Sequence, residues 1–272
     1  MSSFIDATRL AGESGRFTAD LQPDWEIWGP NGGYLSAIAL RAAGEVAPQG
    51  HRPVTYSGQY LASPASGEIA VEAELVKPGR SAACANIRLI QNGRIALQAQ
   101  VWTTGRDTGP EHLDLPRPAV PPPADLPPFE SYLPADAAPH PFWAHFEGRP
   151  VRFIREGERD ERGAVRESWY RLNGFEPTED TFLDCARCVL LIDTLPWPTY
   201  GSNQVPRPTF IAPTLDLTVW FHEPPRSCDW LFLDSYAPAA KQGLIHGGAR
   251  VWSEDGRLLA SGGSQLLVVE GR

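Results

Sequence analysis

The sequence has little of what several common classes of protein require. Only four cysteines, irregularly spaced, occur among 272 residues, and neither a signal peptide nor an apolar run long enough to span a membrane is apparent. We therefore expect reduced thiols, a cytoplasmic location and no membrane segment. Acidic residues outnumber basic ones by 33 to 24, giving a formal net charge of −9. This charge argues against nucleic-acid or membrane-surface binding through a general basic patch, although a few local arginines could still meet an anionic substrate.

Several catalytic motifs are also missing. There is no His-x-x-x-His pair and no Gly-x-Ser-x-Gly elbow, and residues 29–33 lack the glycine spacing of a dinucleotide fingerprint. Cys185 and Cys188 have redox or metal spacing, but no second Cys or His pair completes a zinc set and the segment follows a helical pattern. We interpret them as two helix residues. Any chemistry must then proceed without a metal, a nucleotide loop or an obvious nucleophile.

One stretch, residues 28–46, organises the rest of the chain. Apolar residues occupy nearly every side of the predicted helix, and only Ser36, Arg41 and Glu45 suit a solvent-facing position. Such a helix must be covered by other structure, so we expect a central helix held inside a sheet. It starts with Asn31, Gly32 and Gly33, whose free backbone N–H groups lie at the positive end of the helix dipole. These groups could hold an anion or a polarised carbonyl; the alternative is a tight turn that simply requires glycine.

The alternation and turn signals predict the same set of elements twice. In chain order we expect strands at 16–21, 53–63, 68–77, 81–91 and 94–104 after or around the first helix, then strands at 151–156 and 164–172, a helix at 181–195, and strands at 213–222, 230–237, 243–253 and 257–269. Asn92-Gly93 predicts a tight hairpin, because a type I′ turn requires positive φ at both positions. The second set follows the first at an offset of about 160 residues, which indicates duplication of a whole domain.

A proline-rich segment separates the two copies. Residues 110–141 contain 11 prolines in 32 positions, a composition typical of an extended linker. The expected organisation is an N-terminal unit at 1–109, a linker at 110–141 and a C-terminal unit at 142–272. Each unit has one long apolar helix against an antiparallel sheet, which is an α+β arrangement.

The second helix carries a residue that does not fit its surroundings. Helical periodicity places Asp193 on the apolar face, in the last turn, where both burial and the helix dipole disfavour a negative charge. A carboxylate with a pKa raised by desolvation is suited to act as a general base. The alternative is a carboxylate that caps a loop or pairs with an arginine such as Arg207.

In the following strand, alternation places Thr214 and Asp216 on the face opposite Leu215 and Leu217. Gln265 is an uncharged polar residue in an otherwise apolar last strand. Ordinary strand decoration is the alternative for Thr214 and Gln265.

These residues resemble those of a known family. The duplicated order of elements, Asn31-Gly32-Gly33 at the first helix start, Asp193 after an apolar helix, the segment 213–222, Asp255-Gly256 and Gln265 together resemble the double-hotdog acyl-CoA thioesterases, in particular the acyl-CoA thioesterase II family. The resemblance implies a tandem hotdog fold, with an antiparallel sheet wrapped around a central helix in each unit. It also implies that Asp193, Thr214 and Gln265 hold and activate a hydrolytic water, although a bulge would be needed to aim Gln265. The Gly33 N–H, with Gly32 and Asn31 beside it, would polarise the thioester carbonyl.

The resulting hypothesis is hydrolysis of an acyl-CoA thioester, with no cofactor because CoA is part of the substrate. A non-hydrolytic acyl-CoA-binding protein on the same fold is the alternative. Dehydratase chemistry fits less well, because His222 and His246 have no evident Asp partner. The first helix has no carboxylate matching Asp193, since Glu45 lies on its wet side, so we expect one active cleft per chain. Two fused units form a pseudo-dimer, and a homodimer or higher homo-oligomer through sheet edges is a further expectation.

Overall fold

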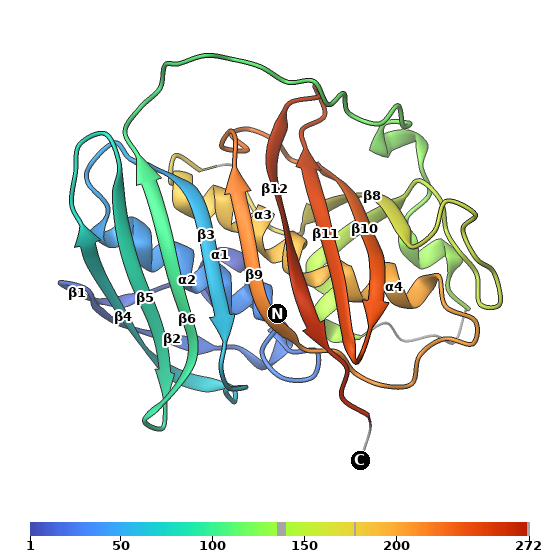
Figure 1. The fold of residues 1–272 in the computed structure, drawn as a ribbon, viewed down its shortest axis with the longest axis horizontal. Helices are drawn as coiled ribbons and strands as arrows, with labels where there is room; N and C mark the ends of the chain where they lie inside the picture. Colours follow the sequence, from blue (N-terminus) through green and yellow to red (C-terminus); the bar gives the residue numbers. More distant parts are fainter. Residues whose placement is uncertain (135–139, 177, 271–272) are drawn as a thin grey trace.

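Twelve strands form one continuous antiparallel sheet (Figure 1). The computed structural model describes residues 1–134, 140–176 and 178–270. The first six strands are β1 (Ala11–Glu13), β2 (Arg16–Leu21), β3 (Arg52–Tyr60), β4 (Gly67–Lys77), β5 (Ala83–Gln91) and β6 (Arg94–Thr104). The other six are β7 (Phe146–Pro150), β8 (Val165–Leu172), β9 (Thr214–Phe221), β10 (Leu231–Lys241), β11 (Leu244–Trp252) and β12 (Leu258–Leu267).

The strand order confirms the predicted duplication. It runs β1-β2-β4-β5-β6-β3 and then β9-β12-β11-β10-β8-β7, so each strand of one half has a counterpart at the same distance from the centre. At the centre β3 pairs antiparallel with β9, from Thr55 opposite Trp220 to Gln59 opposite Asp216. The two units therefore share one sheet through this seam, which we call the β3–β9 seam. We retain 1–109, 110–141 and 142–272 as proposed boundaries of the two units and the linker.

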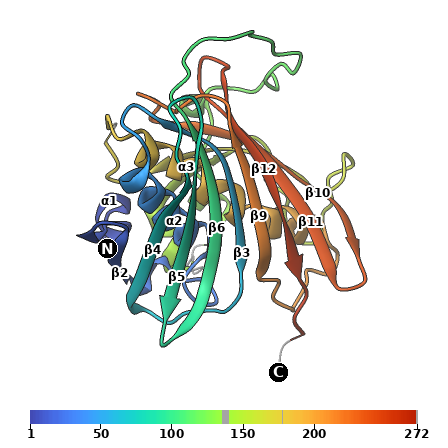
Figure 2. The same ribbon diagram turned by 60° about the vertical axis from the view of Figure 1, so that its left-hand side comes forward.

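Two helices of similar length lie side by side on one face of the sheet (Figures 1 and 2). They are α2 (Gly32–Val46), which packs on β3 to β6, and α3 (Thr181–Thr194), which packs on β3, β9, β11 and β12. The helices also pack against each other. Ten of the fifteen residues of α2 are buried, as expected for a helix covered on most sides. Two shorter helices, α1 (Phe4–Ala7) and α4 (Pro196–Ser202), flank them.

Two predictions made for this part of the chain are wrong. Ser36 does not face solvent but is fully buried, because two tyrosine hydroxyls of β3 satisfy its hydroxyl group. The strand expected at 151–156 is instead β7, at Phe146–Pro150. The apolar residues that suggested the strand have another partner, since Phe153 stacks on Tyr132 of the proline-rich segment at 4.7 Å between ring centroids.

The proline-rich segment crosses outside the sheet and returns along its far end (Figure 1). Its described part contains the short 3₁₀ turns Pro123–Asp125 (η2) and Phe129–Tyr132 (η3) and the start of a third at Pro141, as expected where proline removes backbone donors. Trp169 of β8 fixes it by donating its indole N–H to the Pro121 carbonyl at 3.0 Å. Residues 135–139, within the predicted linker, lie outside the described residues.

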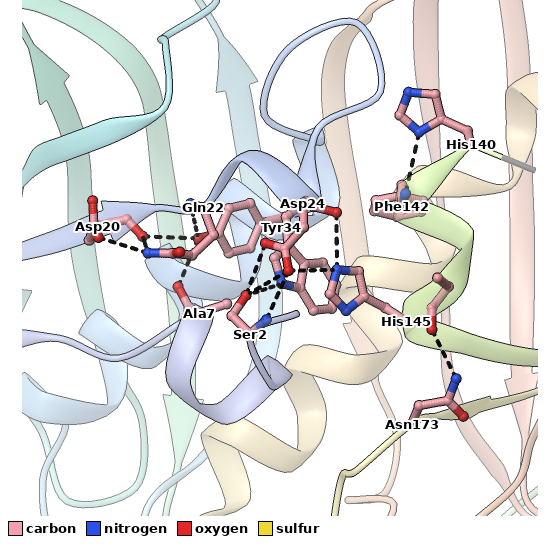
Figure 3. Close-up of polar contacts among 12 residues, drawn as sticks. Ser2, Ala7, Asp20, Gln22, Asp24, Tyr34, His140, Phe142, His145 and Asn173 are labelled. Atoms are coloured by element: carbon pink, nitrogen blue, oxygen red, sulfur yellow. Dashed lines mark hydrogen bonds and ion pairs between the residues drawn. The ribbon is translucent and has the colours of Figure 1, made fainter.

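A buried cluster joins the segment before α2 to the end of the proline-rich segment (Figure 3). His145, in the 3₁₀ turn Pro141–His145 (η4), donates through Nε2 to the Asp24 carbonyl at 3.0 Å. Its ring stacks on Trp25, in the turn Pro23–Trp25 (η1), at 3.8 Å. Burial lowers the pKa of His145, which favours the neutral imidazole. Ser2 adds hydrogen bonds to the Asp24 carboxylate. The cluster holds together two segments that both lead into the functional site.

Candidate active site

The last turn of α3 brings Asp193 against the start of α2. Its side chain is buried, with 5% of its surface exposed, so the prediction of a carboxylate in a dry site is confirmed. If a Cβ were present on Gly32, it would lie 2.8 Å from Oδ2 of Asp193. A side chain at this position would therefore displace the carboxylate from its present place. The positive end of the α2 dipole faces this negative charge.

Three groups stabilise the ionised form of Asp193. Thr214 donates its hydroxyl hydrogen to Oδ1 at 3.0 Å, and the Tyr60 hydroxyl lies 3.4 Å from the same oxygen. The backbone N–H of Gly33 also faces the carboxylate. Burial is nevertheless the largest effect on this group and raises its pKa to about 6. A carboxyl group that titrates near neutrality can accept a proton from water and release it again.

Most of the backbone donors at the start of α2 already have partners. Asn31 is the N-cap residue, and its Oδ1 accepts the Tyr34 N–H at 3.0 Å. Leu35 donates its backbone N–H to the Asn31 carbonyl. Gly33 is covered by α3, since a Cβ there would lie 2.6 Å from the Leu190 carbonyl oxygen. Asn31 and Gly32 line the adjoining cavity, whereas Gly33 is not part of its lining.

Thr214 reaches Asp193 because of a β-bulge. Gln265 of β12 pairs with Asp216 of β9, but the next residue, Leu266, pairs with Thr214. Leu215 is therefore the extra residue and is 39% exposed. The bulge reverses the side-chain alternation, so Thr214 lies on the same inner face as Leu217. The prediction that Thr214 shares a face with Asp216 is wrong for this reason.

Gln265 does not join this group. The inner positions of β12 are Gly262, Ser264 and Leu266, which are buried, while Gln265 lies at an intermediate position between them. It pairs with Asp216 on one side and His246 on the other, and its backbone N–H donates to the Asp216 carboxylate at 3.0 Å. A bulge does occur beside Gln265, but it lies in β9 and turns Thr214 inward instead. The structure thus separates the Gln265 side chain from Asp193.

The structure adds a hydroxyl chain that the sequence reasoning missed. Tyr56 donates to Ser36 at 2.7 Å, Ser36 and Tyr60 share a hydrogen bond of 2.6 Å, and Tyr60 lies within reach of Asp193. Tyr60 also donates to the Gly32 carbonyl at 3.0 Å. The signal was present as Tyr56-x-Gly58-x-Tyr60, because these three residues share one face of a strand. A Cβ on Gly58 would lie 2.5 Å from the Tyr56 hydroxyl.

Comparison with known proteins identifies the family. A family model described as the acyl-CoA thioesterase C-terminal domain matches residues 118–269, and one described as the N-terminal domain matches residues 21–104. The chain belongs to the acyl-CoA thioesterase family. A search of curated protein sequences found no match.

Solved structures show the same fold for this thioesterase. A hotdog-fold protein of unknown function from Alicyclobacillus acidocaldarius is 24% identical, with a TM-score of 0.84 over 99% of this chain and 98% of that one. An acyl-CoA thioesterase II from Mycobacterium marinum is 18% identical, with a TM-score of 0.79 over 99% of both chains. A putative thioesterase II from Thermobifida fusca is 22% identical, with a TM-score of 0.80 over 100% and 98%. The predicted double hotdog is confirmed, and the chain is a thioester hydrolase by family.

A cavity of about 700 Å³ opens beside Asp193 in this thioesterase. Its near end contains the groups already described, from α2, α3, β3 and β9. From there it extends along α4 to the inner face of β7 and β8, under the proline-rich segment. The aromatic and apolar side chains along it include Trp28, Leu35, Phe129, Trp143, Phe146, Trp197 and Leu266. A cavity of this kind suits a largely apolar ligand that meets a few polar groups.

The structure also gives the surroundings of the residues named in the alternative interpretations of the sequence. They contain no cluster of three or more His, Cys, Asp or Glu side chains that could hold a metal, and the four cysteines are buried and free. Arg207 does not pair with Asp193 but donates to the Ile154 carbonyl at 3.0 Å. His222 bonds Ser261 at 2.9 Å, away from the cavity lining. No helix among the described residues is long and apolar enough to cross a membrane.

Proposed function

We propose that this thioesterase hydrolyses an acyl-CoA to the free acid and CoA, with a water molecule activated by Asp193. One observation carries the proposal: a buried carboxylate with a pKa near 6 lies at the start of α2 and at one end of an apolar cavity. Such a group combines the basicity, the low-dielectric surroundings and the access to substrate that water activation requires.

The reaction follows from the contacts of Asp193. Its Oδ1 is occupied by Thr214, so Oδ2 is the oxygen that accepts a proton from the attacking water. The resulting hydroxide forms a bond to the thioester carbonyl carbon, and the carbonyl π electrons move to its oxygen. When the tetrahedral intermediate collapses, the carbon–sulfur bond breaks and the departing CoA thiolate takes the proton back from Asp193. The products are the free acid and the CoA thiol, and the carboxylate is restored.

The carbonyl oxygen is polarised by the start of α2. We assign the main donor to the Gly32 N–H, because Gly32 lines the cavity whereas the Gly33 N–H already faces Asp193. Asn31 also lines the cavity, and its side-chain oxygen is bound to Tyr34, so its amide N–H₂ group is the part left to contact substrate. Preorganised donors of this kind stabilise the developing oxyanion. Gly33 then acts on the carboxylate instead of the carbonyl.

The other residues position the base. Thr214 fixes the orientation of the carboxylate, and Tyr60 supports it from the opposite strand of the seam. Gln265 has no role in this proposal, because its side chain lies away from the carboxylate.

Substituting Asp193 with Asn tests the proposal. The amide keeps the shape of the side chain but cannot accept the proton, so we expect kcat to fall by about 10²- to 10⁴-fold. Turnover is measured by release of free thiol across a panel of acyl-CoA thioesters, and the melting temperature reports folding. Asp216→Asn, on the other face of the neighbouring strand, is the matched control and should retain activity.

Two outcomes would contradict the proposal. Full activity in a folded Asp193→Asn protein would show that another group activates the water. Binding of acyl-CoA by the wild-type protein without thiol release at any chain length would favour the non-hydrolytic alternative.

A further inference from the structure

Two polar side chains of β8 face the cavity without a protein partner. Ser168 is 1% exposed, and its hydroxyl has no hydrogen-bond partner among the described residues. The Nε of Arg166 is also buried, and it too has no hydrogen-bond partner among the described residues. Both residues line the cavity that begins at Asp193. Buried polar groups are normally hydrogen-bonded, so two such atoms in one cavity wall indicate a ligand group that satisfies them.

Arg166 differs from the other arginines near the cavity. Arg149 is ion-paired with Glu147 and donates to the Leu126 carbonyl, and Arg207 is exposed and donates to Ile154. Arg166 makes no ion pair with any described carboxylate, including that of Glu130 in the same cavity lining. Its guanidinium lies over the Phe129 ring at 5.9 Å from the centroid. It is therefore a cation without a counterion under an aromatic cover.

Arg166 and Ser168 lie together, on a strand that does not adjoin the one carrying Thr214. They are two residues apart on one strand, so their side chains share the inner face. From β9, which carries Thr214, the sheet continues through β12, β11 and β10 to β8. Four strand spacings correspond to roughly 19 Å along the sheet. The pair thus lies in a different wall of the cavity from Asp193.

Much of the remaining lining is apolar. Trp197, Leu266, Phe146 and Trp143 contribute to it. A cavity that holds a reacting carboxylate, apolar side chains and an unpaired cation in a separate wall matches a chain of methylene groups that ends in an anion. A methyl end would leave the Arg166 charge and the Ser168 hydroxyl unsatisfied.

We infer that the cavity accepts acyl-CoA thioesters whose acyl chain ends in a carboxylate, and that Arg166 and Ser168 bind this terminal carboxylate. The inference rests on the proposed hydrolysis at Asp193, which places the thioester beside that carboxylate. A phosphate of CoA is the other anion that could meet Arg166. The burial of Ser168 and of the Arg166 Nε favours the acyl end, since the several negative charges of CoA are costly to remove from water.

Binding of unreactive analogues tests the inference without relying on hydrolysis. The probes are S-alkyl thioethers of CoA in matched pairs of equal chain length, one ending in a carboxylate and the other in a methyl group, together with CoA alone. Isothermal titration gives the ratio of the two affinities. We expect the wild-type protein to favour the carboxylate and Arg166→Gln to lower this ratio by about 10- to 100-fold. Ser168→Ala should lower it less.

Arg171→Gln is the matched control. Arg171 lies on the same strand but is paired with Glu147 and Asp229, so its loss should leave the ratio unchanged. A wild-type preference for the methyl end would overturn the inference. So would an equal loss of affinity for all probes and for CoA alone in Arg166→Gln, since this outcome would assign Arg166 to a CoA phosphate. Because thioethers are not hydrolysed, these results are independent of whether Asp193 catalyses the reaction.

Discussion

The Asp193 carboxylate receives hydrogen bonds from several directions, and burial still raises its pKa to about 6. The residue is therefore protonated at mildly acidic pH, and only the ionised form can act as a base. We predict that kcat/KM rises with pH through about 6 and then levels off. A pH–rate profile for one acyl-CoA substrate measures this dependence. A flat profile between pH 5 and pH 8 would contradict the assignment of Asp193 as the base.

The same pKa shift affects stability. The pKa is higher in the folded state than the ordinary value of 3.8, so the folded protein binds the proton more tightly than the unfolded chain does. The contribution of Asp193 to the free energy of unfolding is thus most favourable at low pH. As pH rises from about 4 to 6, this contribution falls by about 3 kcal/mol in total. The side chain in Asp193→Asn does not ionise, so the variant does not lose this stability as pH rises. The melting temperature of the variant should exceed that of the wild type increasingly as pH rises over this range.

Individual site residues differed in how well the sequence predicted them. Asp193 could be found because helical periodicity alone places it on an apolar face. The direction of Thr214 could not, because one extra residue at Leu215 reverses the alternation of β9. Ser36 was misplaced because a lone serine in an apolar helix looks solvent-facing until the tyrosines of β3 are packed against it. Gln265 stood out as a polar residue in an apolar strand and received its catalytic role from the family resemblance, but the register of β12 leaves it away from the carboxylate.

The crossing of α2 and α3 is the element-scale feature on which the site depends. A Cβ on Gly33 would lie 2.6 Å from the Leu190 carbonyl oxygen and 2.8 Å from its Cα, and backbone atoms cannot move aside as a flexible side chain can. We predict that Gly33→Ala destabilises the protein by about 1–3 kcal/mol through overpacking. The loss should exceed the gain in helix propensity that alanine normally brings.

Chemical denaturation measures this change. Gly109→Ala is the control, because a Cβ there meets nothing within 4 Å, and its stability should be close to that of the wild type. Activity of Gly33→Ala should fall as well, since separating the helices moves Asp193 away from the start of α2. An unchanged or higher stability would show that the close helix contact does not require glycine.

Local sequence signals identified the elements where turn chemistry was decisive. Asn92 and Gly93 both have positive φ, 51° and 73°, as the predicted hairpin turn requires. The strand predicted at residues 151–156 is absent because alternating apolar residues can also pack on an irregular neighbour, which here is the proline-rich segment. A local pattern does not show which partner covers an apolar side chain, and this determines whether the segment becomes a strand.

On the scale of the whole molecule, the duplication produces two related places. At each of them, the start of one of the helices α2 and α3 meets the end of the other. One contains Asp193. At the other, α3 begins with its N–H groups of Phe182 and Leu183 already bound by Asp180, and the Phe182 ring packs on Gly44 of α2. Glu45 is exposed there. At the second place, Asp180 therefore caps the helix start and the Phe182 ring fills the space.

We predict one ligand-binding site per chain. Isothermal titration with an unreactive acyl-CoA thioether should give a stoichiometry of one per chain, whatever the oligomeric state. Phe182→Ala is a useful comparison, because it opens space at the second place and should leave the stoichiometry unchanged if polar groups as well as space are needed. Two equivalent sites per chain in the wild type would contradict the prediction.

The β3–β9 seam also has a consequence for how the chain folds. β3 and β9 are central strands of the finished sheet, but their pairing joins residues about 160 positions apart. At cellular elongation rates, β9 emerges on the order of ten seconds after β3. During that interval β3 is an open sheet edge that can pair with other chains, and α2 lacks its cover from α3. The nascent first half is therefore the stage at which aggregation competes with folding, and Asp193 joins the site only after this stage has passed.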